Sequence, residues 1–177
     1  MTVVVAVVLA VVLLAAYLTW LAGRVDRLHV RTDAARAALD AQLVRRAAVA
    51  LELTAQAASA LPSQTTERLA ASAHTAMEVG PEARESAENE LSGALHAVLG
   101  GAGADGLPDR LVDELAAAGA KVGFARQFYN DAVRDTRSLR GRPVPRLLGL
   151  GRRQPLPAYF EIRDTALSGR RPAPDGG

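Results

Sequence analysis

The chain has 177 residues, which suits one ordinary domain together with a membrane segment. It contains no cysteine, so disulfide bonds and thiolate metal sites are excluded. The formal net charge of +2 is too small to indicate nucleic-acid binding, and we expect no nucleic-acid partner. Hydrophobic residues make up 49% of the chain and aromatic residues only 4%, a composition rich in small side chains that favours closely packed helices.

Residues 1–23 are predicted to form a transmembrane anchor. No charged side chain occurs between Thr2 and Gly23, and the run from Val3 to Leu14 consists of Val, Ala and Leu alone. About 20 apolar residues, rising roughly 1.5 Å each, cross the ~30 Å hydrocarbon layer. A helix is expected because lipid offers no partner for unsatisfied backbone groups. Tyr17 and Trp20 fall near the downstream end, where aromatic side chains favour the interface.

A cleavable secretory signal is the competing interpretation of this segment, and it would release an exported bundle. Such a signal has a basic start, a shorter apolar run and a small-residue cleavage site. Here no basic residue precedes the run, and Thr19-Trp20-Leu21 suits cleavage poorly. We therefore expect an uncleaved, single-pass anchor.

Arginines after the apolar segment indicate its orientation. Arg24, Arg27, Arg31 and Arg36 follow it within a short stretch, and none precedes it. Because basic residues are retained on the cytoplasmic side, we expect an outside N-terminus and a cytoplasmic remainder.

Residues 24–140 are predicted to form an antiparallel bundle of about four helices, which makes the fold class all-α. Apolar residues recur at three- and four-residue steps over about 24–60, 65–79, 82–99 and 108–139, and no segment alternates like a strand. Short connections containing Pro62, Gly80-Pro81 and the Gly100–Gly106 loop make neighbouring helices antiparallel. Glu82, Glu85 and Glu88 are expected near the positive end of the third helix.

Residues 141–177 are predicted to form a basic, Pro- and Gly-rich tail that is largely irregular. Within it, Ala158 to Ile162 is a small apolar island that could dock on the bundle.

Five stretches of the sequence stand out as possible family motifs: Ala41-Gln42-Leu43-Val44-Arg45-Arg46, Asn89-Glu90-Leu91-Ser92-Gly93-Ala94-Leu95, Ala125-Arg126-Gln127-Phe128-Tyr129-Asn130-Asp131-Ala132-Val133, Leu147-Leu148-Gly149-Leu150 and Phe160-Glu161. Together they resemble the LemA family of bacterial membrane-anchored helical proteins. The resemblance covers about Arg31 to Glu161. The chain departs from the family at Ala47-Ala48-Val49-Ala50 and in the Gly-rich connection before the last helix. The resemblance implies an N-terminal helix in a bacterial cell membrane, a cytoplasmic antiparallel bundle and no catalytic activity.

Motifs that could carry chemistry are weak. Gly101 to Gly106 matches Gly-x-Gly-x-x-Gly, but the dinucleotide site needs a preceding strand and here a helix is expected. His29, His74 and His96 lie in three different predicted helices without ligand spacing, and we interpret them as ordinary, partly exposed histidines. No catalytic residue, metal or cofactor is predicted.

The predicted interaction surface is basic. Tyr129 and Asn130 lie at or beside the apolar stripe of the fourth helix, which favours packing, with a partner surface as the alternative. If the helices alternate in direction, the fourth returns its arginines to the anionic inner leaflet. A solvated linker or contact with an acidic protein patch are the alternatives. The surface comprises Arg126, Tyr129, Asn130, Arg137, Arg140, Arg142, Arg146, Arg152 and Arg153.

These expectations together favour a membrane-anchored adaptor or scaffold without catalytic activity. Its partners would be the anionic inner leaflet or an envelope or cytoplasmic protein. The alternatives are a hydrolase or metal-dependent enzyme with a site inside the bundle, and the exported bundle described above.

Overall fold

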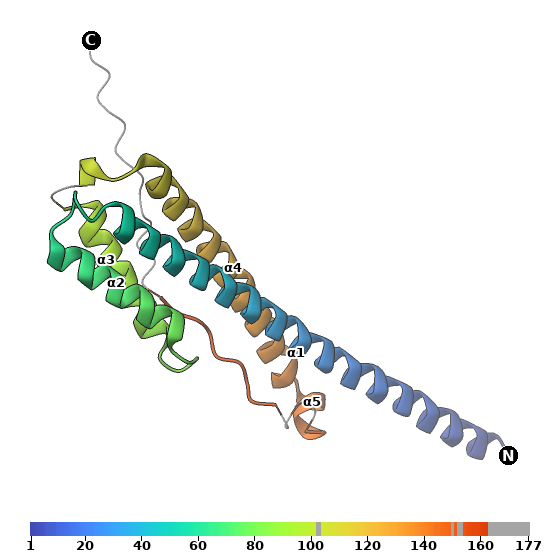
Figure 1. Ribbon diagram of the computed structural model, residues 1–177. Helices are drawn as coiled ribbons and strands as arrows, with labels where there is room; N and C mark the ends of the chain where they lie inside the picture. The colour runs from blue at the N-terminus through green and yellow to red at the C-terminus, as the bar shows by residue number, and fades with distance from the viewer. Residues whose placement is uncertain (102–103, 150, 152–153, 163–177) are drawn as a thin grey trace, which may run out of the picture. The chain divides into compact units, whose positions relative to one another are not determined.

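The computed structural model describes residues 1–101, 104–149, 151 and 154–162. All regular structure in these ranges is helical, which confirms the all-α fold class (Figure 1). The elements are α1 (Thr2–Gln56), α2 (Ser63–Glu78), α3 (Arg84–Leu99), a short 3-10 helix (Ala104–Gly106), α4 (Asp109–Gly141) and α5 (Pro143–Leu147).

The helix ends differ from the expected ones where the chain turns. The helix α1 ends at Gln56, because the residues up to Leu61 form turns in which Ala57 and Leu61 nevertheless stay buried. Residues 81–83 form a turn, so α3 begins at Arg84 and not at residue 82 as expected. The five-residue α5 was not expected, although a proline at the first turn of a helix is favourable because its φ is already helical.

The described chain packs as two compact units. The first unit joins residues 1–36 to residues 128–159, and the second unit comprises residues 37–127 together with the segment that starts at Phe160. The long helices α1 and α4 each contribute to both units. The predicted limits at residues 23 and 140 do not coincide with these divisions, and residues 163–177 of the predicted tail lie outside the described residues.

The second unit is a bundle of four helical segments, from α1, α2, α3 and α4 (Figure 1). Alanine and leucine fill its core, and each of the four segments contributes, as Leu53, Leu69, Leu95 and Leu111 illustrate. Arg45 on α1 pairs with Glu114 on α4, and Glu52 pairs with Arg110 at 2.7 Å. Because the partners on α4 run in the opposite order, α1 and α4 are antiparallel.

A buried ion pair joins α1 to α3 inside this bundle. Arg46 Nη2 lies 2.6 Å from Glu88 Oε2, and the two side chains are 3% and 0% exposed. Glu88 lies near the start of α3, as expected from the sequence, and its buried carboxylate faces α1. Burial raises the pKa of Glu88, and the positive charge and hydrogen bond of Arg46 oppose that rise.

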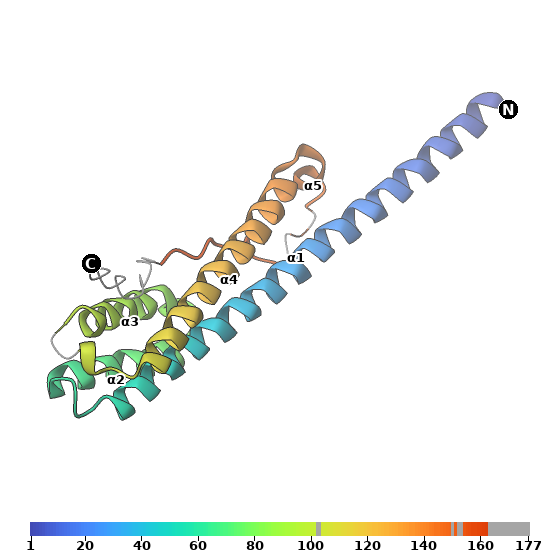
Figure 2. The same ribbon diagram turned by 90° about the horizontal axis from the view of Figure 1, so that it is seen from above.

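The apolar start of α1 contacts no other described segment of the first unit (Figure 2). The large apolar side chains from Val3 to Leu14 are between 57% and 76% exposed. By length and composition, this part of α1 is a candidate membrane span, the only one among the described residues. An apolar surface of this extent would be unfavourable in water, and lipid would cover it.

Within the first unit, the end of α4 packs antiparallel against α1, directly after this span. Leu139 packs with Leu21 and Val25. Further along, Thr32 Oγ1 lies 3.0 Å from Thr136 Oγ1 and also reaches the Ala132 carbonyl oxygen at 3.3 Å. As the residue numbers on α1 rise from Leu21 to Thr32, the numbers of their partners on α4 fall from Leu139 to Ala132, so the two helices are antiparallel here. The end of α4 thus lies beside the downstream end of the apolar segment.

Candidate functional site

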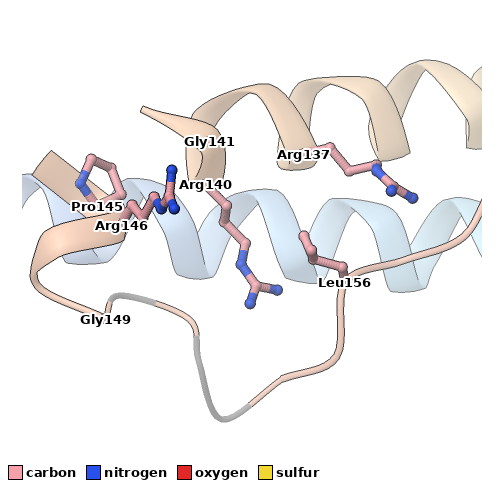
Figure 3. A pocket seen from close by; sticks show the side chains of 7 residues that line it. All are labelled: Arg137, Arg140, Gly141, Pro145, Arg146, Gly149 and Leu156. Carbon is pink, nitrogen blue, oxygen red and sulfur yellow. The ribbon is translucent and has the colours of Figure 1, made fainter. Parts of the chain in front are cut away.

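The candidate site is a pocket where α4 ends. Figure 3 shows its walls, which are the last turns of α4, the short α5, the turn at Gly149 and the extended segment that carries Leu156. Its volume is about 390 Å³. We call it the arginine pocket, and its described lining residues are Arg137, Arg140, Gly141, Pro145, Arg146, Gly149 and Leu156.

Glycines and prolines in the predicted tail build this pocket. The backbone of Arg142 is extended, so α4 ends before it, and α5 begins at Pro143. Gly149 and Gly151 have φ of 63° and 75°, a conformation that side chains with a Cβ rarely adopt. At Gly151 a Cβ would also lie 3.1 Å from Val25 Cγ1. These residues reverse the chain, so that residues 154–159 run back along α4.

Two of the pocket arginines are held by this returning segment. Arg137 Nη1 donates to the Pro157 carbonyl oxygen at 3.0 Å, and its guanidinium lies 5.5 Å from the ring centre of Tyr159. Arg140 Nη1 donates to the Gln154 carbonyl oxygen at 3.0 Å and projects from α4 into the pocket (Figure 3). A guanidinium has five N–H donors, so these bonds orient each side chain and leave donors for a ligand.

Helix α5 exposes basic and apolar side chains together. Arg142 and Arg146 are exposed, and the described residues provide no ion-pair or hydrogen-bond partner for either guanidinium. Val144, Leu147 and Leu148 are 38%, 87% and 46% exposed. A short helix with this pairing of side chains resembles an interfacial element more than a packed one.

The other predicted surface residues lie apart from the pocket or serve packing. Tyr129 is 3% exposed, and its hydroxyl donates to the Ala158 carbonyl oxygen at 2.8 Å, in agreement with the packing interpretation. Asn130 is half-buried, next to Tyr129 on α4. Arg126 belongs to the second unit, where it donates to the Ile162 carbonyl oxygen at 3.2 Å. Arg152 and Arg153 lie outside the described residues.

A second, smaller pocket in the first unit has a volume of about 250 Å³ and is lined partly by His29 and Thr32. His29 is only 6% exposed, so the expectation of a partly exposed histidine was wrong there. Its Nδ1 lies 2.9 Å from the Val25 carbonyl oxygen, and its Nε2 lies 3.5 Å from Arg140 Nη1. The sequence could not reveal this burial because it depends on α4 packing against that face of α1.

No family model matches the chain, and the comparisons with curated proteins and with solved structures found no match either. The resemblance to the LemA family therefore stays a prediction that rests on the sequence stretches alone.

Proposed function

We propose that the chain is a single-pass membrane protein whose cytoplasmic helices form a non-enzymatic adaptor or scaffold at the anionic inner leaflet. One observation carries the proposal: Leu139 at the end of α4 packs on Leu21 and Val25 at the end of the candidate span. This packing brings the arginine pocket and α5 to the level at which α1 would leave the membrane.

The side chains around the end of the span support this placement. Tyr17 and Trp20 stack with ring centres 6.1 Å apart, and the Arg24 guanidinium lies 5.5 Å from the Trp20 ring centre. Aromatic side chains of this kind concentrate at membrane interfaces, and basic residues that follow a span favour the cytoplasmic side. An anionic leaflet attracts basic side chains by about 1 kcal/mol each near the surface.

The packing of α1 also favours an anchor over a cleaved signal. Leu21 and Val25 are 4% and 2% exposed and belong to the apolar cluster of the first unit. Cleavage near Leu21 would cut the helix at residues that this unit uses for packing. The exported bundle therefore remains the less favoured alternative.

Each unit, taken by itself, exposes an aromatic side chain of α4 that fits a protein partner. Phe124 in the second unit is 65% exposed, and Phe128 in the first unit is 67% exposed. Large aromatic side chains are enriched in protein interfaces and are costly to leave in water. They support the adaptor proposal, in which the partner is an envelope or cytoplasmic protein.

An enzyme with a site inside the bundle is the alternative from a different class. Such a site needs carboxylates or histidines that are free to meet a substrate or metal. Among the described residues of the second unit, the buried carboxylate is Glu88, and it binds Arg46. This contact favours a structural role for Glu88.

Single introduced cysteines test the topology, because the chain has none of its own. We expect a membrane-impermeant maleimide to label Thr2→Cys in intact protoplasts and Ser138→Cys only in inside-out vesicles. Labelling of both in denatured membranes is the control. Labelling of Ser138→Cys in protoplasts would refute the cytoplasmic domain. An N-terminus beginning after the apolar run, found by mass spectrometry, would establish the exported bundle instead.

A further inference from the structure

We propose that the arginine pocket binds the phosphate of an anionic phospholipid headgroup in the leaflet from which α1 emerges. The proposal rests on the proposed function and deepens it, because it assigns leaflet contact to a defined site and names the ligand. General attraction of basic residues to the leaflet would need no such site.

Charge is the first argument. Arg137, Arg140 and Arg146 line one small pocket, and none of its described lining residues is acidic. Three guanidinium groups repel one another in a partly enclosed space unless an anion joins them. Arginine is the side chain best suited to phosphate oxygens, because its planar fork can donate two hydrogen bonds to them at once.

Preorganisation is the second argument. The bonds from Arg137 to Pro157 and from Arg140 to Gln154 hold both side chains at the pocket wall before any ligand arrives. Arg146 is exposed on α5 and is free to close over a ligand. A volume of about 390 Å³ lies at the small end of the range for ligand sites, which suits a compact headgroup.

The surroundings of the pocket distinguish a lipid from a soluble phosphate. Leu147 is 87% exposed on α5, next to Arg146, and Leu156 in the pocket wall is 51% exposed. A soluble phosphate would leave these leucines in water, whereas a lipid supplies acyl chains to cover them. The contact of Leu139 with Leu21 and Val25 places the pocket beside the span.

The test uses the full chain reconstituted in phosphatidylcholine vesicles that contain trace spin-labelled lipid. Electron paramagnetic resonance then gives the association of spin-labelled phosphatidate relative to spin-labelled phosphatidylcholine at the protein surface. The pocket variant is Arg140→Gln with Arg146→Gln. The control variant, Arg27→Gln with Arg31→Gln, removes the same charge from two exposed arginines that follow the span and do not line the pocket.

We expect the wild-type chain to prefer phosphatidate, the control to lose no more than about fivefold per arginine, which diffuse attraction gives, and the pocket variant to lose more than the control. Arg146→Gln alone should lose more per arginine than the control does and puts no described side-chain contact at risk, so it serves if the double variant misfolds. Inorganic phosphate at millimolar concentration should not displace spin-labelled phosphatidate. Displacement would identify a soluble phosphate as the ligand and overturn the lipid assignment.

The remaining outcomes separate this inference from the proposed function. Equal losses in the pocket and control variants would overturn the pocket and leave a diffuse leaflet contact in place. If the wild-type chain shows no preference for phosphatidate, both the pocket and the leaflet contact fail. The cysteine labelling then decides separately whether the anchor and the cytoplasmic adaptor stand.

Discussion

The buried pair of Arg46 and Glu88 permits a sharp test of what holds the second unit together. Removing two ions from water costs several kcal/mol for each ion, and only good geometry with further hydrogen bonds offsets that cost. Here one contact of 2.6 Å joins the pair. Arg46 Nε and Glu88 Oε1 are buried, and the described residues give neither a hydrogen-bond partner. The pair is therefore an incompletely satisfied polar group in an apolar core.

Replacing one partner and replacing both should have opposite effects. Glu88→Leu leaves the Arg46 guanidinium buried without its counter-ion, and we expect it to lower the free energy of unfolding by about 3–5 kcal/mol. Arg46→Met should cost a similar amount because it leaves a buried carboxylate. The double variant fills the same space with apolar atoms, and we expect it to be neutral or more stable by about 1–4 kcal/mol.

Urea denaturation of the full chain in detergent micelles, followed by circular dichroism at 222 nm, measures these changes. Trp20, the only tryptophan, lies in the first unit and does not report on the second. Hydrogen exchange of the α3 amides would localise the effect. Arg45→Met is the matched control: Arg45 is adjacent, but its pair with Glu114 is 62% and 27% exposed, and we expect a loss below about 1 kcal/mol. A double variant as unstable as both single losses combined would refute the reasoning.

Other predictions concern pH, packing and hydrogen bonds. Burial raises the pKa of Glu88 above its ordinary 4.5, so the folded chain holds that proton more tightly than the unfolded chain does. The stability that this group contributes should therefore fall as the pH rises from about 4.5 through the folded pKa. The urea midpoint of the wild type should show this decline, and the urea midpoint of Glu88→Gln should not. Gly93 lies within α3 with no atom within 4 Å of an added Cβ, so Gly93→Ala should raise the free energy of unfolding by about 1 kcal/mol, and a lower urea midpoint would contradict this. Tyr129→Phe should cost about 1 kcal/mol by leaving the Ala158 carbonyl oxygen without this donor, measured as faster hydrogen exchange in residues 154–159.

The helices could be predicted from the sequence because their apolar stripes are regular. Leu111, Leu115, Ala118 and Val122 follow three- and four-residue steps, and all four are buried in α4. The ends were less predictable, since they depend on turns whose residues remain buried, such as Ala57. The helix α5 was missed because its prolines and the flanking glycines indicate irregular structure when they are considered singly.

The sequence indicated a basic surface that includes the arginines of the candidate site, but not the pocket that three of them line. A run of arginines without acids indicated an anionic partner, but the choice of Arg137, Arg140 and Arg146 depends on the reversal at Gly149 and Gly151. That reversal depends on tertiary packing, so the spacing of residue types along the sequence does not predict it.

The buried ion pair was missed although the sequence carried a signal for it. Arg46 lies three residues after Leu43 and four before Ala50, both in the apolar stripe of α1, and Glu88 lies three residues before Leu91 in α3. Opposite charges at stripe positions of two helices indicate a buried pair. The position of Glu88 near the start of its helix favoured the helix-dipole interpretation instead.

An alanine-rich core explains why a costly ion pair would persist. Ala47 and Ala50 on α1 and Ala87 and Ala94 on α3 are all at most 4% exposed, and such small side chains interlock weakly. Helices that pack through alanines lose little when they slide by one turn, because other alanines then meet. A shift of one turn would separate Arg46 from Glu88 inside the core and strand both charges. The pair would thus destabilise the wrong register more than it stabilises the right one. The apolar double variant should then unfold at a higher urea concentration, yet its α3 amides should exchange hydrogen faster because α3 can adopt more than one register against α1.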